Sequence, residues 1–328
     1  MRIHLESVHR SYRVRRPPQT GSRLTRLVRR VSSEVEALRG IDLRVDSGER
    51  VGYIGLNGAG KSTTMKLIAG ILTPTAGRVT VDGRDPHRDR RRLSAGLGYL
   101  AAQRSSLWWD LPVKDSYQLI RRVYDIEPAV FRRRSDRLIA HLDIGRYLDT
   151  PVRELSLGNR TRAELVGTLL HAPRLLLLDE PTIGLDVFAR EAICDILRNI
   201  PQDVFQDTPP TIVMASHDLR DVEAICDRIV MIDGGRLVYD GKLDELRAHG
   251  GGRRKLVVHH TAGHRLPVPP GLTQTGDQTR TLTTYAFAQG ELPSELLGAL
   301  FVDPEINDVR IEAPSLEGLI KDFYPRNR

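Results

Sequence analysis

The chain has 328 residues, of which 40% are hydrophobic and 28% charged, and its formal net charge is +7. This length predicts one large domain with a smaller one, or two of similar size, and the composition excludes a wholly disordered or fibrous chain. The basic balance fits nucleic acid, anionic lipid or phosphorylated small molecules without choosing among them. Cys194 and Cys226 are too few for a disulfide framework or a zinc finger, and we expect both in the core.

The N-terminus lacks the apolar core of a signal peptide, and no stretch reaches the roughly 20 apolar residues of a membrane-spanning helix. We therefore expect any membrane role to come through a partner. Alternation and helical spacing predict the remaining elements in chain order. They are strands at 3–8 and 38–45, a strand at 51–54, a helix at 62–72, strands at 78–83 and 97–102, helices within 113–172, a strand at 175–178, a helix at 186–199, a strand at 211–215, and a hairpin over 229–239.

The continuous apolar runs at 175–178 and 211–215 are typical of parallel strands buried on both faces, which predicts an α/β fold. A glycine-rich segment at 248–254 predicts a linker. We expect a large domain over 1–247 and a small α/β accessory domain over 255–328. The accessory domain is predicted to have strands at 255–260, 279–287 and 306–312, a helix at 293–301 and a final helix opened by Pro314.

A basic insertion at 14–35 interrupts the N-terminal strands, and its central apolar residues recur at helical spacing among arginines. Such a helix suits contact with anionic lipid headgroups or with a partner protein. A solvated basic helix packed on its own domain is an equal alternative, because charge runs usually face water.

The strongest motif is GLNGAGKST at 55–63, which matches G-x-x-x-x-G-K-[ST] between a predicted strand and a predicted helix. Its glycines allow the backbone N–H groups to point at phosphate oxygens, and the helix N-terminus adds positive potential. Lys61 supplies a cation for the β- and γ-phosphates, and the Ser62 hydroxyl is a Mg²⁺ ligand. We expect the nucleotide to contact Gly55, Asn57, Gly58, Ala59, Gly60, Lys61, Ser62 and Thr63.

Two carboxylates, Asp179 and Glu180, follow the apolar run at 175–178. The carboxyl ends of parallel strands are where ligands bind in such sheets. Asp179 is the candidate for the Mg²⁺ shell, and Glu180 is the candidate base that orients and deprotonates the attacking water. A solvated strand end is the alternative, which the phosphate loop upstream disfavours.

These motifs resemble those of the ATP-binding cassette (ABC) ATPases, and the resemblance covers residues 1–247. The segment LSLGN at 155–159 is similar to the LSGGQ signature of that family, with Leu157 in place of a glycine and Asn159 in place of the glutamine. The resemblance implies that Ser156, Gly158 and Asn159 of one subunit contact the ATP held by another. Ser156 is also a candidate N-cap for the helix that follows.

The resemblance assigns four further residues. Gln103 matches the glutamine that touches Mg²⁺ or water and links the site to the membrane partner. Asp186 matches an aspartate that reaches across the dimer, and His217 a histidine that hydrogen-bonds the γ-phosphate. Tyr12 matches the aromatic residue that stacks on adenine, although a core tyrosine is a serious alternative.

The family's fold is a RecA-like core with an antiparallel β subdomain and a helical subdomain, here at about 104–172. The resemblance implies a head-to-tail dimer, which we interpret as a dimer of identical chains, that ATP closes and hydrolysis reopens. It also implies separate transmembrane permease subunits, through which this chain is attached to the cytoplasmic side of a bacterial cell membrane. Trp108 and Trp109 lie where this family docks the permease, with burial in the core as the alternative.

The segment from Asp179 to Asp186 and the ending APSLEGL at 313–319 resemble the exporter branch that includes drug, antibiotic and viologen efflux systems. The alternative function is a soluble cassette ATPase that acts on ribosomes or DNA. Only one cassette is present and no sustained heptads appear, which disfavours that alternative. Polysaccharide export and sugar import stay open, and no specific nucleic-acid partner is expected.

Overall fold

The computed structural model of the chain describes residues 1–16, 31–101, 105–200, 209–249, 254–263, 266, 268, 272–274, 281–287, 292 and 294–312. Contacts between Cα atoms divide the chain into two compact units, Met1–Asp240 and Gly241–Arg328. Among the described residues, no helix is long and apolar enough to cross a membrane.

A six-stranded sheet forms the centre of the first unit, in the order β5-β6-β7-β3-β8-β9. Its strands are β3 (Arg50–Gly55), β5 (Leu97–Ala101), β6 (Leu175–Asp179), β7 (Thr211–Ser216), β8 (Arg228–Asp233) and β9 (Arg236–Lys242). The pairs β5/β6, β6/β7, β7/β3 and β3/β8 are parallel. Every residue of β6 and β7 is buried, which explains their continuous apolar sequence. The predicted α/β fold with parallel strands is confirmed.

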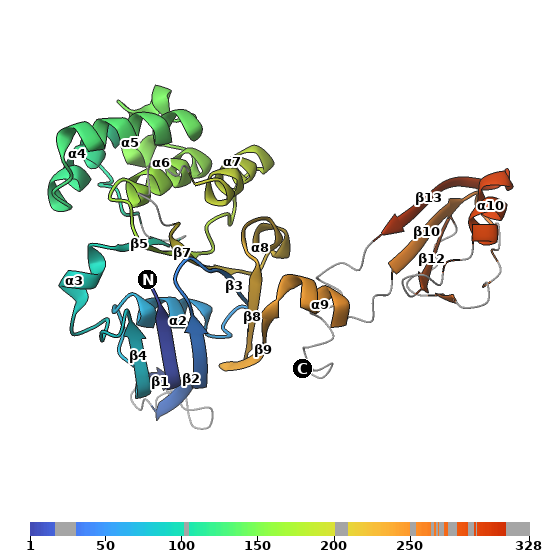
Figure 1. Cartoon of the computed structure of the whole chain (residues 1–328), viewed down its shortest axis with the longest axis horizontal. Helices are drawn as coiled ribbons and strands as arrows, with labels where there is room; N and C mark the ends of the chain where they lie inside the picture. The colour runs from blue at the N-terminus through green and yellow to red at the C-terminus, as the bar shows by residue number, and fades with distance from the viewer. Residues whose placement is uncertain are drawn as a thin grey trace, which may run out of the picture. The chain divides into compact units, whose positions relative to one another are not determined.

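Parallel pairing brings the carboxyl ends of β3, β6 and β7 to one edge of this sheet. A helix follows each of these strands: α2 (Lys61–Ile68), α7 (Val187–Arg198) and α8 (Leu219–Ile225) (Figure 1). Cys194 and Cys226 are buried as predicted, the first on α7 and the second directly after α8. Burial raises the pKa of the Cys194 thiol to about 12.

A second, antiparallel sheet has the order β2-β1-β4 and consists of β1 (Ile3–Arg16), β2 (Val31–Val45) and β4 (Ala76–Val81). The expectation that residues 14–35 interrupt the N-terminal strands is wrong at the two ends of that insertion, because β1 and β2 extend into it. Their pairing continues to Arg16 opposite Val31, so each strand satisfies the backbone groups of the other. The centre of the insertion, where apolar residues recur at helical spacing among arginines, lies outside the described residues.

Helices make up most of the segment between β5 and β6: α4 (Val113–Val123), α5 (Pro128–His141) and α6 (Leu157–Leu169). Figure 1 shows them grouped together, away from the antiparallel sheet. The short helix α3 (Arg90–Ser94) precedes β5. The helices are interrupted near Thr150 and Pro151, where the 3₁₀ turns Gly145–Tyr147 and Val152–Glu154 lie between α5 and α6.

The second unit contains a four-stranded antiparallel sheet in the order β11-β12-β10-β13. Its elements are α9 (Leu243–His249), β10 (Arg254–His260), β11 (Thr273–Gln274), β12 (Leu282–Phe287), α10 (Ser294–Val302) and β13 (Ile306–Glu312). Leu256, Val258, Tyr285 and Phe287 lie in its core. The two ends of the predicted linker 248–254 belong to α9 and β10, and the helix predicted from Pro314 lies outside the described residues.

Candidate active site

The phosphate loop connects β3 to α2, as the motif predicts. Gly58 and Gly60 have φ values of +83° and +117°, which L side chains rarely adopt. A Cβ on Gly60 would come within 2.6 Å of a Leu38 methyl group and 2.8 Å of the Ala37 carbonyl oxygen. This backbone path therefore requires glycine, and it places Lys61 at the first position of α2.

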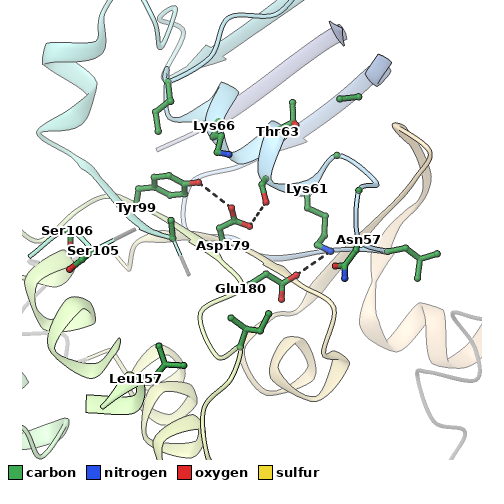
Figure 2. Close-up of a pocket in the computed structure, with 18 residues that line it drawn as sticks. Asn57, Lys61, Thr63, Lys66, Tyr99, Ser105, Ser106, Leu157, Asp179 and Glu180 are labelled. Atoms are coloured by element: carbon green, nitrogen blue, oxygen red, sulfur yellow. Dashed lines mark hydrogen bonds and ion pairs between the residues drawn. The ribbon is translucent and has the colours of Figure 1, made fainter. Parts of the chain in front are cut away.

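Lys61, Glu180 and His217 form one continuous chain of polar contacts. The Lys61 ammonium donates to the Gly55 carbonyl oxygen at 2.6 Å and lies 3.3 Å from Oε1 of Glu180 (Figure 2). The second oxygen of Glu180 lies 2.7 Å from Nδ1 of His217. Lys61 is 6% exposed, so its charge is well shielded from water and needs these partners.

Ser62 and Asp179 meet beside this chain. The Ser62 hydroxyl donates to Oδ1 of Asp179 at 3.0 Å, and the Tyr99 hydroxyl donates to Oδ2 at 3.4 Å (Figure 2). Burial raises the pKa of Asp179, against the opposing effect of the Ser62 hydrogen bond. A hydroxyl and a carboxylate oxygen fit Mg²⁺, which is usually held by one or two carboxylates together with water and phosphate. Accordingly, the described residues contain no cluster of three or more His, Cys, Asp or Glu side chains that could hold a metal by themselves.

The backbone at Glu180 is strained, with a φ of +54°. For any residue other than glycine, this left-handed backbone conformation costs on the order of 1 kcal/mol. A hydrogen bond from its N–H to the Ala215 carbonyl oxygen, at 2.8 Å, fixes the turn to the end of β7. The turn directs the carboxylate toward Lys61 and His217 instead of along the strand.

A cavity of about 820 Å³ opens at this edge of the sheet. Its volume suits a ligand of the size of a nucleotide. Figure 2 shows Lys61, Asp179 and Glu180 facing it, with Leu157 on the far wall. The residues that line it are Ala37, Leu56, Asn57, Gly58, Gly60, Lys61, Ser62, Thr63, Lys66, Ile71, Tyr99, Ala101, Ser105, Ser106, Leu157, Asp179, Glu180 and Ile183.

Tyr12 lies on β1 beside the phosphate loop. Its hydroxyl is 3.5 Å from the Thr63 hydroxyl, and the Arg10 guanidinium lies 4.9 Å from the centre of its ring. The side chain is half-buried, so Tyr12 is not one of the fully buried core tyrosines such as Tyr53. Tyr12 therefore lies beside the phosphate loop. Its stacking on adenine stays a prediction.

The signature segment begins α6. Ser156 caps this helix, because its hydroxyl accepts a hydrogen bond from the Asn159 N–H at 3.3 Å. A Cβ on Gly158 would lie 3.0 Å from the Ala189 Cβ, so α6 packs closely on the start of α7. Asp186 caps α7 by accepting from the Ala189 N–H at 2.8 Å. The predicted Ser156 cap is confirmed. Among the described residues, no contact joins Ser156, Gly158 or Asp186 to Lys61. Gln103 lies outside the described residues.

Trp108 and Trp109 are 41% and 49% exposed, so the alternative that they are buried in the core is wrong. The Arg160 guanidinium lies 5.2 Å from the Trp109 ring. Trp108 borders a groove of about 230 Å³ between β5 and the helices α4 and α6. The other groove residues are Leu97, Gly98, Tyr99, Ser106, Ile120, Val123, Tyr124, Gly167, Thr168 and His171.

The parallel sheet, the glycine-rich loop and the paired carboxylates define a P-loop nucleotide-binding protein. Comparison with known proteins narrows this class. Residues 38–183 match the family described as ABC transporter. The chain is 33% identical over 289 residues to the daunorubicin resistance ATP-binding protein DrrA3 of Streptomyces coeruleorubidus, with 86% of this chain and 89% of that protein covered. It is 32% identical to the Nod factor export ATP-binding protein I of Ralstonia nicotianae, with 72% of this chain and 74% of that protein covered.

Solved structures agree with these relatives. A structure described as the ATP-binding subunit of an ABC transporter has a TM-score of 0.61 and 25% identity, and it covers 76% of this chain and 94% of its own. A dimeric ATP-binding cassette bound to ADP and Pi has a TM-score of 0.60 over 74% of this chain and 98% of its own, and at 23% identity it supports the fold alone. The chain belongs to the ABC transporter family, as an ATP-binding and ATP-hydrolysing subunit.

Proposed function

We propose that this chain hydrolyses ATP for an exporter whose permease is a separate polypeptide. The observation that carries this proposal is the unbroken series of contacts from Lys61 through Glu180 to His217, of which Lys61 and Glu180 line the cavity. Relatives named for daunorubicin resistance and for Nod factor export support the direction of transport. Nothing in the described residues favours the alternative of a soluble ATPase acting on ribosomes or DNA.

Each residue of the site has a distinct role in this proposal. Lys61 neutralises the β- and γ-phosphates, and Glu180 accepts a proton from the attacking water. Since Nδ1 of His217 faces Glu180, the opposite ring nitrogen, Nε2, is the one that remains to contact the γ-phosphate. Ser62 and Asp179 hold Mg²⁺, which when bound supplies positive charge to the phosphates. Gln103 completes the metal shell in this proposal.

A second copy of the chain supplies the remaining contacts to ATP. Ser156 and Asp186 are exposed caps at the starts of α6 and α7, and both helix N-termini offer positive potential to a phosphate of the other subunit. Val187 and Phe188 directly after Asp186 are 66% and 80% exposed, which suits burial against a partner subunit. Hydrolysis then requires two chains, because each holds only half of a complete site.

The permease docks at the groove bordered by Trp108. Two adjacent exposed tryptophans, the first of which lines this groove, are typical of an interaction hot spot. Asp110 directly after them forms an ion pair with Arg153 at 2.6 Å. The groove is also lined by Tyr99, whose hydroxyl contacts Asp179. Docking there places the chain at the cytoplasmic face of the membrane. Contact of residues 14–35 with anionic lipid stays a prediction.

The experiment is a pull-down of tagged Glu180→Gln protein from detergent-solubilised cells with ATP, followed by mass spectrometry. We expect a polytopic membrane protein to be recovered, and recovery should be lost with Lys61→Ala, which removes the phosphate-binding cation. Recovery of ribosomal proteins or DNA-associated factors without a membrane protein would contradict the transporter function and leave the ATPase site intact.

A further inference from the structure

An ion-pair network lies beside the site and has no part in the roles proposed so far. Arg190, on α7, contacts two carboxylates at once: Nε donates to Oδ1 of Asp221 at 2.5 Å, and Nη2 lies 2.6 Å from Oδ2 of Asp218. Asp221 is 1% exposed, and its other oxygen accepts a hydrogen bond from the Thr182 hydroxyl. One guanidinium thus joins the segments that follow β6 and β7.

Both anchor points of this network are adjacent to the catalytic pair in sequence. Thr182 comes two residues after Glu180, and Asp218 comes directly after His217. Burial opposes ionisation of Asp218, but the hydrogen bonds that it accepts outweigh burial and lower its pKa. Asp218 is therefore a charged partner for Arg190 near neutral pH, which favours the ion pair between them.

We propose that Arg190 is a positioning residue that holds the Glu180 carboxylate against the His217 imidazole. The planar guanidinium presents several N–H groups in a fixed fork, so it can set the distance between two carboxylates in a way that a single ammonium cannot. The strained backbone of Glu180 persists only where its surroundings fix it, and the Thr182 anchor provides such a restraint. This inference rests on the roles proposed for Glu180 and His217.

A second arginine on α7, Arg198, provides a control that distinguishes positioning of the catalytic pair from simple attachment of α7 to α8. Arg198 also reaches α8, where its Nε donates to the Ala224 carbonyl oxygen at 2.8 Å, and it forms an ion pair with Asp195 at 3.3 Å. Arg198 is at the end of α7 that is farther along the chain from Glu180, and it contacts neither Asp218 nor Asp221 in the described network. It is therefore a matched control.

The test compares steady-state ATP hydrolysis, nucleotide affinity and thermal stability for wild type, Arg190→Gln, Arg190→Lys and Arg198→Gln. We expect Arg190→Gln to lower kcat about 30-fold, since displacement of a reacting group by about 1 Å can cost up to 100-fold. KM and the affinity for an ATP analogue should change less than about twofold, because the Lys61 loop is untouched. The kcat of Arg190→Lys should lie between those of wild type and Arg190→Gln. Arg198→Gln should keep kcat within about twofold of wild type.

Three results would overturn the inference. They are an unchanged kcat in Arg190→Gln, an equal loss of kcat in Arg198→Gln, or a loss of nucleotide affinity that accounts for the loss of rate. If Arg190→Gln does not fold, Arg190→Lys is the deciding variant. A kcat of Arg190→Lys equal to that of wild type would then overturn the inference. Glu180→Gln is measured alongside. Full activity in Glu180→Gln would instead contradict the proposed role of Glu180, so the two failures are distinguishable.

Discussion

Nδ1 of His217 lies 2.7 Å from Oε2 of Glu180, although 36 residues separate them in the chain and they follow different strands. This contact orients both groups next to the cavity that Glu180 lines: it determines which imidazole nitrogen remains for the phosphate and which carboxylate oxygen remains for Lys61. Neither side chain could hold this position alone, because Glu180 is at a strained turn and His217 is half-exposed.

Glu180→Gln tests the general base. The amide preserves the size of the side chain but cannot accept a proton from water, so kcat should fall by at least about 100-fold while ATP remains bound. Bound but unhydrolysed ATP should also hold two chains together. Phosphate release gives the rate, and size-exclusion chromatography with ATP gives the oligomeric state. A monomer in the presence of ATP would count against this role.

Tyr12→Ala tests the adenine contact. Loss of one aromatic stacking partner typically costs about 1–3 kcal/mol per base, so nucleotide affinity should weaken at least roughly fivefold. Tyr12→Phe keeps the ring and should bind within about twofold of wild type, since the hydroxyl contact to Thr63 is long at 3.5 Å. Tyr147→Ala is a suitable control, because an arginine also lies over the Tyr147 ring, at 5.2 Å, but this tyrosine is in the helical segment between β5 and β6 and not beside the phosphate loop. Equal affinity for wild type and Tyr12→Ala would show that Tyr12 is structural.

The chemistry of the site was predictable where it depends on short motifs beside strands. The loop at 55–63, the pair Asp179 and Glu180, and His217 all follow a buried strand directly, so their edge of the sheet can be inferred from parallel pairing alone. Tyr99 was missed. It is half-buried within the edge strand β5, and no motif around it indicates that its hydroxyl reaches Asp179.

Features that join distant segments were not predictable. The contacts of Arg190 with Asp218 and Asp221 depend on how α7 packs against α8, and neither helix carries a motif that specifies this. The secondary structure of the basic insertion was also not predictable from local sequence, because it depends on pairing with a distant strand. Its local spacing indicates a helix, but pairing between β1 and β2 continues into both of its ends and determines their conformation.

Trp108→Ala and Trp109→Ala test the docking groove. Removal of an exposed aromatic anchor should reduce recovery of the membrane partner at least about tenfold, as expected of a hot-spot residue. Nucleotide affinity of the isolated protein should not change, because neither tryptophan lines the large cavity. Val238→Ala removes an apolar side chain of similar exposure, 39%, from β9 and serves as the control. Unchanged recovery with both tryptophan variants would exclude this groove as the docking site.

The burial of His171 predicts how the free energy of unfolding depends on pH. Its ring stacks on Tyr124 with centroids 4.0 Å apart, and burial lowers its pKa from 6.5 to about 4, against the opposing effect of a hydrogen bond with the Leu97 carbonyl oxygen. A histidine that is harder to protonate when folded stabilises the fold fully above its unfolded pKa. That contribution is lost as the pH falls through the window from about 6.5 to about 4.

The wild type should therefore lose about 2 kcal/mol of unfolding free energy between about pH 7.5 and pH 5 that a His171→Phe variant does not lose. Urea unfolding followed by tryptophan fluorescence measures this, because the chain's two tryptophans, Trp108 and Trp109, both lie in this region. Phenylalanine preserves the stacking on Tyr124 and cannot titrate. His141→Gln on the exposed side of α5 should retain the wild-type pH dependence, since that histidine is exposed. If wild type and His171→Phe respond equally to acid, protonation of His171 does not limit the stability of the helical segment.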